Sequence, residues 1–210
     1  METLEQVDAA RPLLIIGGNL ALDFANTVDD PGGPRHFDHI GETHRLLTWA
    51  QNRGLFTQPE RDELRASIHE HQSEAQHDLE HLHLLRHAIQ IGFTDVARGQ
   101  PFATTSWHQL RKADANAIDH ADLTTTAVGG QLHWTGPDLR IVEWSVAHAA
   151  YELLTGDRID RIKHCASCPW LFLDQSKNGR RRWCSMDDCG TNAKIRRYVA
   201  QRAARRGATA

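Results

Sequence analysis

Residues 165–189 read CASCPWLFLDQSKNGRRRWCSMDDC and decide the fold of the C-terminal part of the chain. All four cysteines of the protein lie in this segment, as Cys165-x2-Cys168 and Cys184-x4-Cys189, with fifteen residues between the two pairs. Two close pairs separated by about 15–20 residues are typical of a tetrahedral Zn²⁺ site. Four thiolates leave no coordination position for water or substrate, so the sequence predicts one structural zinc ion bound by these four cysteines.

The cysteines have other interpretations, namely four unrelated structural thiols or a redox-active pair, and His164 could replace one thiolate ligand. No apolar h-region of a signal peptide is visible, and the longest apolar run, Leu13 to Ile16, is far too short to cross a bilayer. We therefore expect a cytoplasmic protein with no membrane partner. A reducing compartment favours metal-bound cysteines over disulfides.

Charge divides the chain into two unlike parts. From Arg158 to the end, 13 Lys and Arg stand against 4 Asp and Glu, whereas the preceding residues hold 11 basic and 23 acidic side chains. A basic segment is attracted to polyanions, and an acidic one is repelled by them. The sequence therefore predicts a nucleic acid as the partner of the C-terminal part.

Hydrophobic periodicity predicts an α+β fold, with a mostly helical N-terminal domain at residues 11–155 and a small β-hairpin. Asn19 is a candidate N-cap of the first helix. The hairpin is expected at residues 123–134, with Gly129 and Gly130 in its turn. Helices are expected near residues 20–28, 46–50, 59–89, 106–117 and 139–154, and a short strand at 13–16.

Residues 158–206 are predicted to form a zinc ribbon or treble-clef-like module. A domain this small needs apolar burial as well as the metal. Trp170, Phe172 and Trp183 lie between or beside the cysteines and are expected to supply that small core, rather than a platform on which bases stack.

Basic side chains gather in a predicted helix after Cys189 and in the run just before Cys184. Ile195 and Val199 share one face of this helix and are expected to pack on the zinc knuckles. Contacts to phosphate are expected, rather than readout of bases. The alternatives are that the arginines stay solvated or pair with the acidic part of the chain. The candidate nucleic-acid-binding residues are Arg180, Arg181, Arg182, Lys194, Arg196, Arg197 and Arg202.

Asn19, Asp23 and Asn26 form a polar stripe on the first predicted helix. They could line a pocket for a small-molecule effector, with Gly17 and Gly18 allowing close approach. The other interpretation is helix capping and solvation at the surface. Two adjacent glycines alone are not a phosphate-binding motif.

The cysteine segment resembles the CGNR-type zinc-finger proteins, whose N-terminal part is the ABATE domain. The resemblance is carried by the residues at 165–174, 181–186 and 189–190 with Lys194, and by Asn19 with Leu22-Asp23-Phe24-Ala25-Asn26-Thr27. Members of that family are described as stress-induced transcription regulators with a DNA-binding zinc finger. The resemblance implies a zinc-dependent DNA-binding regulator.

One departure from the family pattern falls at residues 189–192, where Cys-Gly-Asn-Arg is replaced by Cys-Gly-Thr-Asn. Asn192 thus takes the place of the expected arginine. If that arginine binds phosphate in relatives, this chain lacks a charge-assisted bond. If it stabilises the knuckle instead, Asn192 could act as a helix cap.

No signature of an enzyme is present, since neither a nucleophile elbow nor an H-E-x-x-H motif occurs, and no catalytic residue is predicted. His77, His81, His83 and His87 include pairs at i, i+4, a spacing that can chelate a metal, but the preferred interpretation is a solvated or interfacial histidine face. The sequence favours a regulator of transcription, and the alternative is a protein-interaction adaptor whose basic module binds an acidic protein surface. It leaves the oligomeric state open, with a homodimer as one arrangement.

Overall fold

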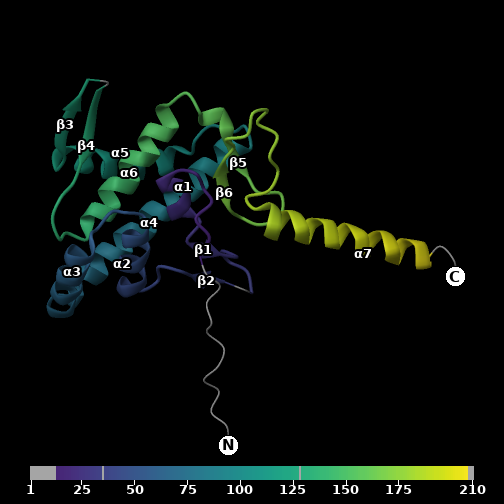
Figure 1. The fold of residues 1–210 in the computed structure, drawn as a ribbon, viewed down its shortest axis with the longest axis horizontal. Coiled ribbons are helices and arrows are strands. Elements are labelled where there is room, and N and C mark those ends of the chain that lie inside the picture. Colours follow the sequence, from purple (N-terminus) through teal and green to yellow (C-terminus); the bar gives the residue numbers. More distant parts are fainter. Residues whose placement is uncertain (1–12, 35, 128, 208–210) are drawn as a thin grey trace, which may run out of the picture.

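The computed structural model describes residues 13–34, 36–127 and 129–207 (Figure 1). The N-terminal part is mostly helical, and each of the three sheets in the described residues is a two-stranded antiparallel pair, so the predicted α+β class is confirmed. Its elements are α1 (Leu20–Ala25), β1 (Val28–Asp29), β2 (Phe37–Asp38), α2 (Thr43–Asn52), α3 (Gln58–Glu70), α4 (Gln72–Ala97), α5 (Thr104–Asp119), β3 (Asp122–Thr126), β4 (Gly129–His133) and α6 (Arg140–Thr155).

The C-terminal part contains two short strands and a long terminal helix. A single 3-10 turn, η1 (Ile159–Arg161), leads into the antiparallel pair β5 (Ile162–His164) and β6 (Leu171–Leu173). A π-helical turn, η2 (Met186–Gly190), runs directly into α7 (Thr191–Gly207). None of the described helices is long and apolar enough to span a bilayer.

Helix starts follow the capping chemistry of the sequence. Asn19 caps α1, because its side-chain oxygen accepts the Ala21 N–H at 2.8 Å. Thr57 and Glu60 form a reciprocal capping box at the start of α3. The helix predicted over residues 59–89 is instead two helices, because His71 leaves the helical region at φ −121° and ψ 49°.

Two strand predictions need correction. Residues 13–16 form no strand in the described chain; Leu13 and Ile16 pack as single side chains against apolar clusters. The hairpin exists, but Gly129 and Gly130 belong to β4 rather than to the turn, since Gly129 pairs with Thr126. β3 ends at Thr126, and the Thr126–Gly129 pair is the pair of the ladder nearest the turn.

The main core surrounds α1, which packs against α4, α6 and β6 (Figure 1). Leu22 and Phe24 of α1 are fully buried. Ile162, Leu171 and Leu173 of the β5–β6 pair belong to this same core. The zinc module is therefore built onto the N-terminal part through shared packing.

A second, smaller apolar cluster lies within the zinc module. Trp170, Phe172, Cys165 and Cys184 form it, with Trp183 packed alongside. Phe172 is fully buried. The small aromatic core predicted beside the metal is present.

Candidate zinc centre and basic helix

The four cysteines converge on one point. Cys165 follows β5 and Cys168 precedes β6. Cys184 lies just before η2, and Cys189 lies within it. Their sulfur atoms all lie within 4.8 Å of one another, with Sγ–Sγ distances of 3.5 Å for Cys168–Cys184 and 3.6 Å for Cys184–Cys189. Zn–S bonds of about 2.3 Å in a tetrahedron place the sulfurs about 3.8 Å apart. The site therefore fits one structural zinc ion with four thiolate ligands.

Backbone hydrogen bonds hold the two knuckles together. The Cys165 N–H donates to Trp170 O at 2.9 Å, which closes the first knuckle, and the Ala166 N–H donates to Arg182 O at 2.9 Å, which joins it to the second. The Cys184 N–H points at Cys165 Sγ, 3.4 Å away. Hydrogen bonds from Cys168 and Cys184 lower the pKa of Cys165, and the same contacts raise the pKa of Cys168 and Cys184, so without a metal the thiolate charge concentrates on Cys165. The thiolate is the form that binds a metal.

Arg181 and Asp174 brace the loop between the cysteine pairs. Arg181 Nε donates to Trp183 O at 2.8 Å, its Nη2 donates to Cys184 O, and the guanidinium lies 4.7 Å from the Phe172 ring centre. Asp174 is buried and accepts the Arg181 N–H at 2.9 Å. Arg181 was predicted among the DNA contacts. In the structure its guanidinium instead hydrogen-bonds to the backbone of the second knuckle.

The second knuckle continues into α7. Ser185 Oγ accepts the Asp188 N–H at 3.1 Å and caps η2. Gly190 is buried against Met186, where an added Cβ would come within 3.0 Å of the Met186 sulfur. Asn192 is the second residue of α7 and is exposed, so it is not the N-cap of that helix. The short η2 turn thus ties the direction of α7 to the metal ligands.

The predicted packing of α7 on the knuckles is wrong. Ile195 and Val199 are 54% and 59% exposed, and Tyr198 beside them is 61% exposed. The helix extends away from the rest of the molecule (Figure 1). Its contact with the first knuckle is made by Arg196, whose Nη2 donates to Ser167 Oγ. The reason is that η2 aims the helix outward, so its apolar side chains reach no knuckle.

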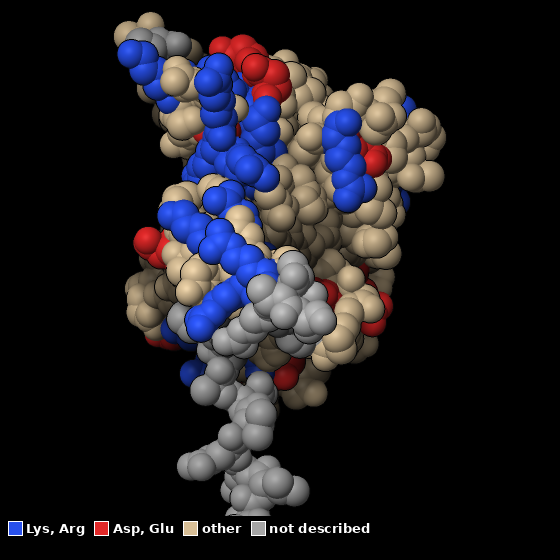
Figure 2. Space-filling view, turned by 90° about the vertical axis from the view of Figure 1, so that its right-hand side faces the viewer, with Lys and Arg blue, Asp and Glu red and all other residues tan. Residues whose placement is uncertain are grey.

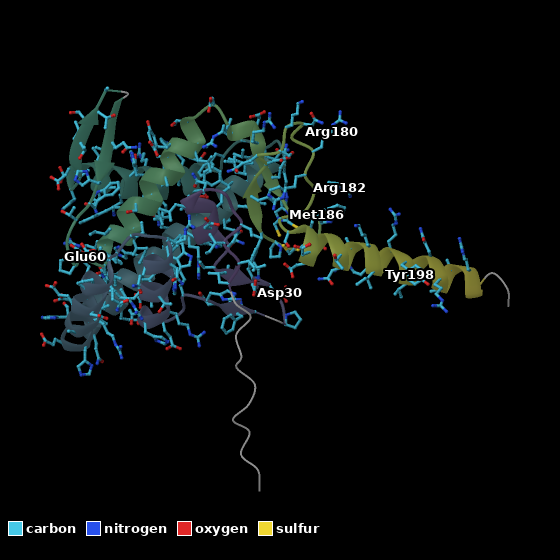
Figure 3. The ribbon with its side chains drawn as sticks, viewed as in Figure 1. Asp30, Glu60, Arg180, Arg182, Met186 and Tyr198 are labelled. Atoms are coloured by element: carbon cyan, nitrogen blue, oxygen red, sulfur yellow. The ribbon has the colours of Figure 1, made fainter. Side chains whose placement is uncertain are left out.

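Most of the predicted basic residues lie at the surface of the module. Arg180 and Arg182 are exposed on the loop before Cys184, and Figure 3 shows both at the outer edge of the module, on the same side of the molecule as α7. Arg182 stacks over Trp183 at 5.3 Å. Lys194, Arg197 and Arg202 are exposed along α7. Figure 2 shows Lys and Arg side chains gathered over this face, with few acidic ones among them.

The side chains of the predicted polar stripe, Asn19, Asp23 and Asn26, form hydrogen bonds and an ion pair within the protein. Asp23 is 3% exposed, accepts the Gly17 N–H at 2.7 Å and pairs with Arg53 at 3.1 Å. Burial raises the pKa of Asp23, and the Gly17 bond and Arg53 only partly offset that effect. Gly17 must be glycine here, because a Cβ would come within 2.8 Å of the Asp23 backbone nitrogen.

Asn26 is 2% exposed and connects the two parts of the chain. Its Nδ2 donates to Leu171 O and its Oδ1 accepts the Leu171 N–H, both at 2.8 Å. The polar atoms of Asp23 and Asn26 are thus bonded within the chain, and Asn19 is used as a cap. The sequence motif marked these residues, but it did not indicate that Asn26 holds β6.

Sequence reasoning also missed a contact between the β1–β2 hairpin and the zinc module. Trp170 Nε1 donates to Val28 O at 3.4 Å, and Asp29 binds His39 at 3.0 Å beside the cysteines. Nothing in the spacing of these residues signals the contact.

In the histidine-rich stretch, His77 and His81 have ring centres 4.4 Å apart, but the only metal-ligand group found within the described residues is the cysteine cluster.

Comparison with known families matches this architecture. Residues 18–157 match the ABATE family, described as "Putative stress-induced transcription regulator", and residues 161–202 match the CGNR zinc finger. No curated protein matches the chain. The ABATE match covers well over half of the sequence, and the second match contains all four zinc ligands. The chain therefore belongs to the family of ABATE-domain proteins that carry a C-terminal CGNR zinc finger.

Proposed function

We propose that this protein is a zinc-dependent DNA-binding regulator of transcription, acting in the cytoplasm in a response to stress. The observation that carries the proposal is α7, a 17-residue basic helix that extends from the zinc module. At 1.5 Å per residue it is about 25 Å long, and the major groove of B-DNA admits an α-helix.

Charge supports one orientation on DNA. Lys194, Arg197 and Arg202 are exposed on α7, and Arg180 and Arg182 extend the basic surface on the neighbouring loop. The acidic N-terminal part would be repelled by phosphate, so DNA would approach the module from the side of α7. Each phosphate contact releases counterions and lowers log K by about 0.9 per log unit of salt.

The metal would act through structure. Zinc fixes η2, and η2 runs into α7, so the direction of the basic helix depends on the four thiolates. We assign no catalytic role to the zinc ion, because four thiolates complete its coordination.

The experiment is a fluorescence anisotropy titration of zinc-loaded protein against mixed-sequence duplexes from about 50 to 200 mM salt. We expect the double variant Arg197→Ala and Arg202→Ala to bind every sequence more weakly. The slope of log K against log salt should become shallower by the equivalent of up to two phosphate contacts. Arg98→Ala, on the N-terminal part, is the matched control and should leave binding unchanged. No binding at low salt by zinc-loaded protein would refute the proposal.

A second function has one observation in its favour. Ile195, Tyr198 and Val199 form an exposed apolar stripe at i, i+3 and i+4 on α7. Such a stripe suits a protein partner or a second copy of the chain, as an adaptor or a homodimer would need. Replacing Ile195 and Val199 by Ser would impair association through this stripe while sparing DNA binding. Sedimentation equilibrium shows whether the chain forms a homodimer and whether the variant loses it.

A further inference from the structure

A cavity of about 230 Å³ lies beside the zinc centre, where the β1–β2 hairpin faces the second knuckle. Leu14, Ile16 and Trp170 give it an apolar wall, and three of the four zinc ligands also line it. The zinc ion itself needs only the space between sulfur atoms that lie 3.5–3.6 Å apart. Most of the cavity volume therefore lies outside the metal position and can hold another molecule.

The polar lining of the cavity contains one carboxylate on each side, and each carboxylate is bonded to a second polar residue of the lining, His39 or Ser185. Asp29 comes from β1, where it holds His39 at 3.0 Å, and the His39 side chain is 6% exposed. Asp188 comes from η2, where it accepts a hydrogen bond from Ser185 Oγ at 2.8 Å. Among the described residues neither carboxylate forms an ion pair with Lys or Arg. Four thiolates around Zn²⁺ add a net charge of −2, so the lining attracts cations.

We propose that this cavity binds a small organic ammonium ion with an apolar body. The ammonium group would donate to Asp29 and Asp188, and the apolar body would lie against Trp170 and Ile16. An anion would be repelled by the same lining. At roughly 30 Å³ per water molecule the cavity equals about eight waters, which suits a molecule of about eight to ten non-hydrogen atoms.

The position of the cavity gives such a ligand a consequence. Asp29 belongs to the N-terminal part, whereas Asp188 belongs to the turn that continues into α7. A bound ammonium ion would connect the two carboxylates and restrain η2. The ligand would thereby link the ABATE part to the basic helix, without requiring that the helix bind DNA.

Isothermal titration of the zinc-loaded full chain with 2-phenylethylamine tests the proposal. The neutral and anionic analogues are 2-phenylethanol and phenylacetate. We expect saturable binding of the amine, and binding at least about tenfold weaker for the alcohol and the acid, since a hydrogen bond to a charged group contributes about 1.5 kcal/mol or more. No saturable binding, or equal binding of amine and alcohol, would overturn the proposal.

Two variants locate the site. Asp29→Asn and Asp188→Asn should each weaken binding of the amine about tenfold or more, while Asp187→Asn, the exposed neighbour outside the cavity lining, should not. Zinc content and melting temperature establish that each variant is folded. Full affinity in both folded cavity variants would contradict the assignment.

A cobalt-substituted sample identifies the binding group. Its visible spectrum should keep the four-thiolate bands when the amine is added, because the proposed contacts are carboxylates. A changed spectrum would mean that the amine binds the metal instead. The titration contains no DNA, so its failure would leave the proposed DNA binding untouched, and absence of DNA binding would leave this site untouched.

Discussion

Asn26 and Leu171 are 145 positions apart and exchange two hydrogen bonds of 2.8 Å. The side-chain amide of Asn26 pairs with both backbone groups of Leu171, in the way that a neighbouring strand would. Because β6 also supplies side chains to the main core, this pair fixes the first zinc knuckle against α1. The family motif that contains Asn26 thus has a structural role at the junction of the two family matches.

Asn26→Ala should destabilise the whole protein, because it leaves both backbone groups of Leu171 buried without partners. Each orphaned group costs about 1–3 kcal/mol, so the free energy of unfolding should fall by roughly 2–6 kcal/mol. Urea denaturation of the zinc-loaded protein measures the change. Asn178→Ala, at an exposed loop position, is the control and should cost under about 0.5 kcal/mol. A loss as small as that for Asn26→Ala would contradict the role of the pair.

Removal of zinc should affect the two knuckles and leave β6 in place. The amide of Gly190 is held by Ser185 in the second knuckle, whereas the amides of Leu171 and Leu173 bond to Asn26 and Gly17 in the N-terminal part. Metal binding is coupled to folding where the ligands converge. After treatment with a chelator, we expect fast hydrogen exchange at Gly190 and retained protection at Leu171 and Leu173. Equal loss of protection at all three amides would show that the metal supports the whole core.

Arg181 and Arg182 are neighbours with different surroundings, and they make a matched pair of variants. Arg181→Ala removes the donor to the carbonyls of Trp183 and Cys184, so it should lower zinc affinity and melting temperature. Arg182→Ala removes an exposed cation stacked on Trp183, so zinc affinity should change little. Competition with a chromophoric chelator measures the affinity. Similar zinc affinities in the two variants would refute the structural role of Arg181.

The sequence identified those features that depend on local spacing. The two cysteine pairs predicted the knuckles, and the basic run predicted α7, because both signals lie within a few turns of chain. The contact of Asn26 with Leu171 joins distant segments, and no local pattern encodes it. The exposure of Ile195 was missed for a different reason: an apolar face predicts burial, but only the geometry of η2 determines whether a surface lies opposite it.

Acid should weaken the protein partly through Asp38. Burial pushes the pKa of Asp38 upward, but the Arg86 guanidinium, whose two nitrogens lie 2.7 and 2.5 Å from the carboxylate oxygens, outweighs burial and lowers the pKa below its ordinary value. A lowered folded-state pKa means that the folded protein binds fewer protons than the unfolded chain. The stabilisation is therefore present above the unfolded pKa of about 3.9 and is lost as the pH falls through the lower folded-state value.

Asp38→Asn should remove this part of the acid response, and it should also destabilise the protein near neutral pH because Arg86, 8% exposed, loses its charged partner. Urea denaturation of both proteins from pH 6 to pH 3 gives the difference in unfolding free energy at each pH, in which zinc loss from protonated thiolates affects both alike. We expect that difference to shrink below about pH 4. Asp62→Asn, on the exposed face of α3, should show a small difference throughout. A difference for Asp38→Asn that stays constant to pH 3 would mean that the Asp38–Arg86 pair does not carry the acid sensitivity.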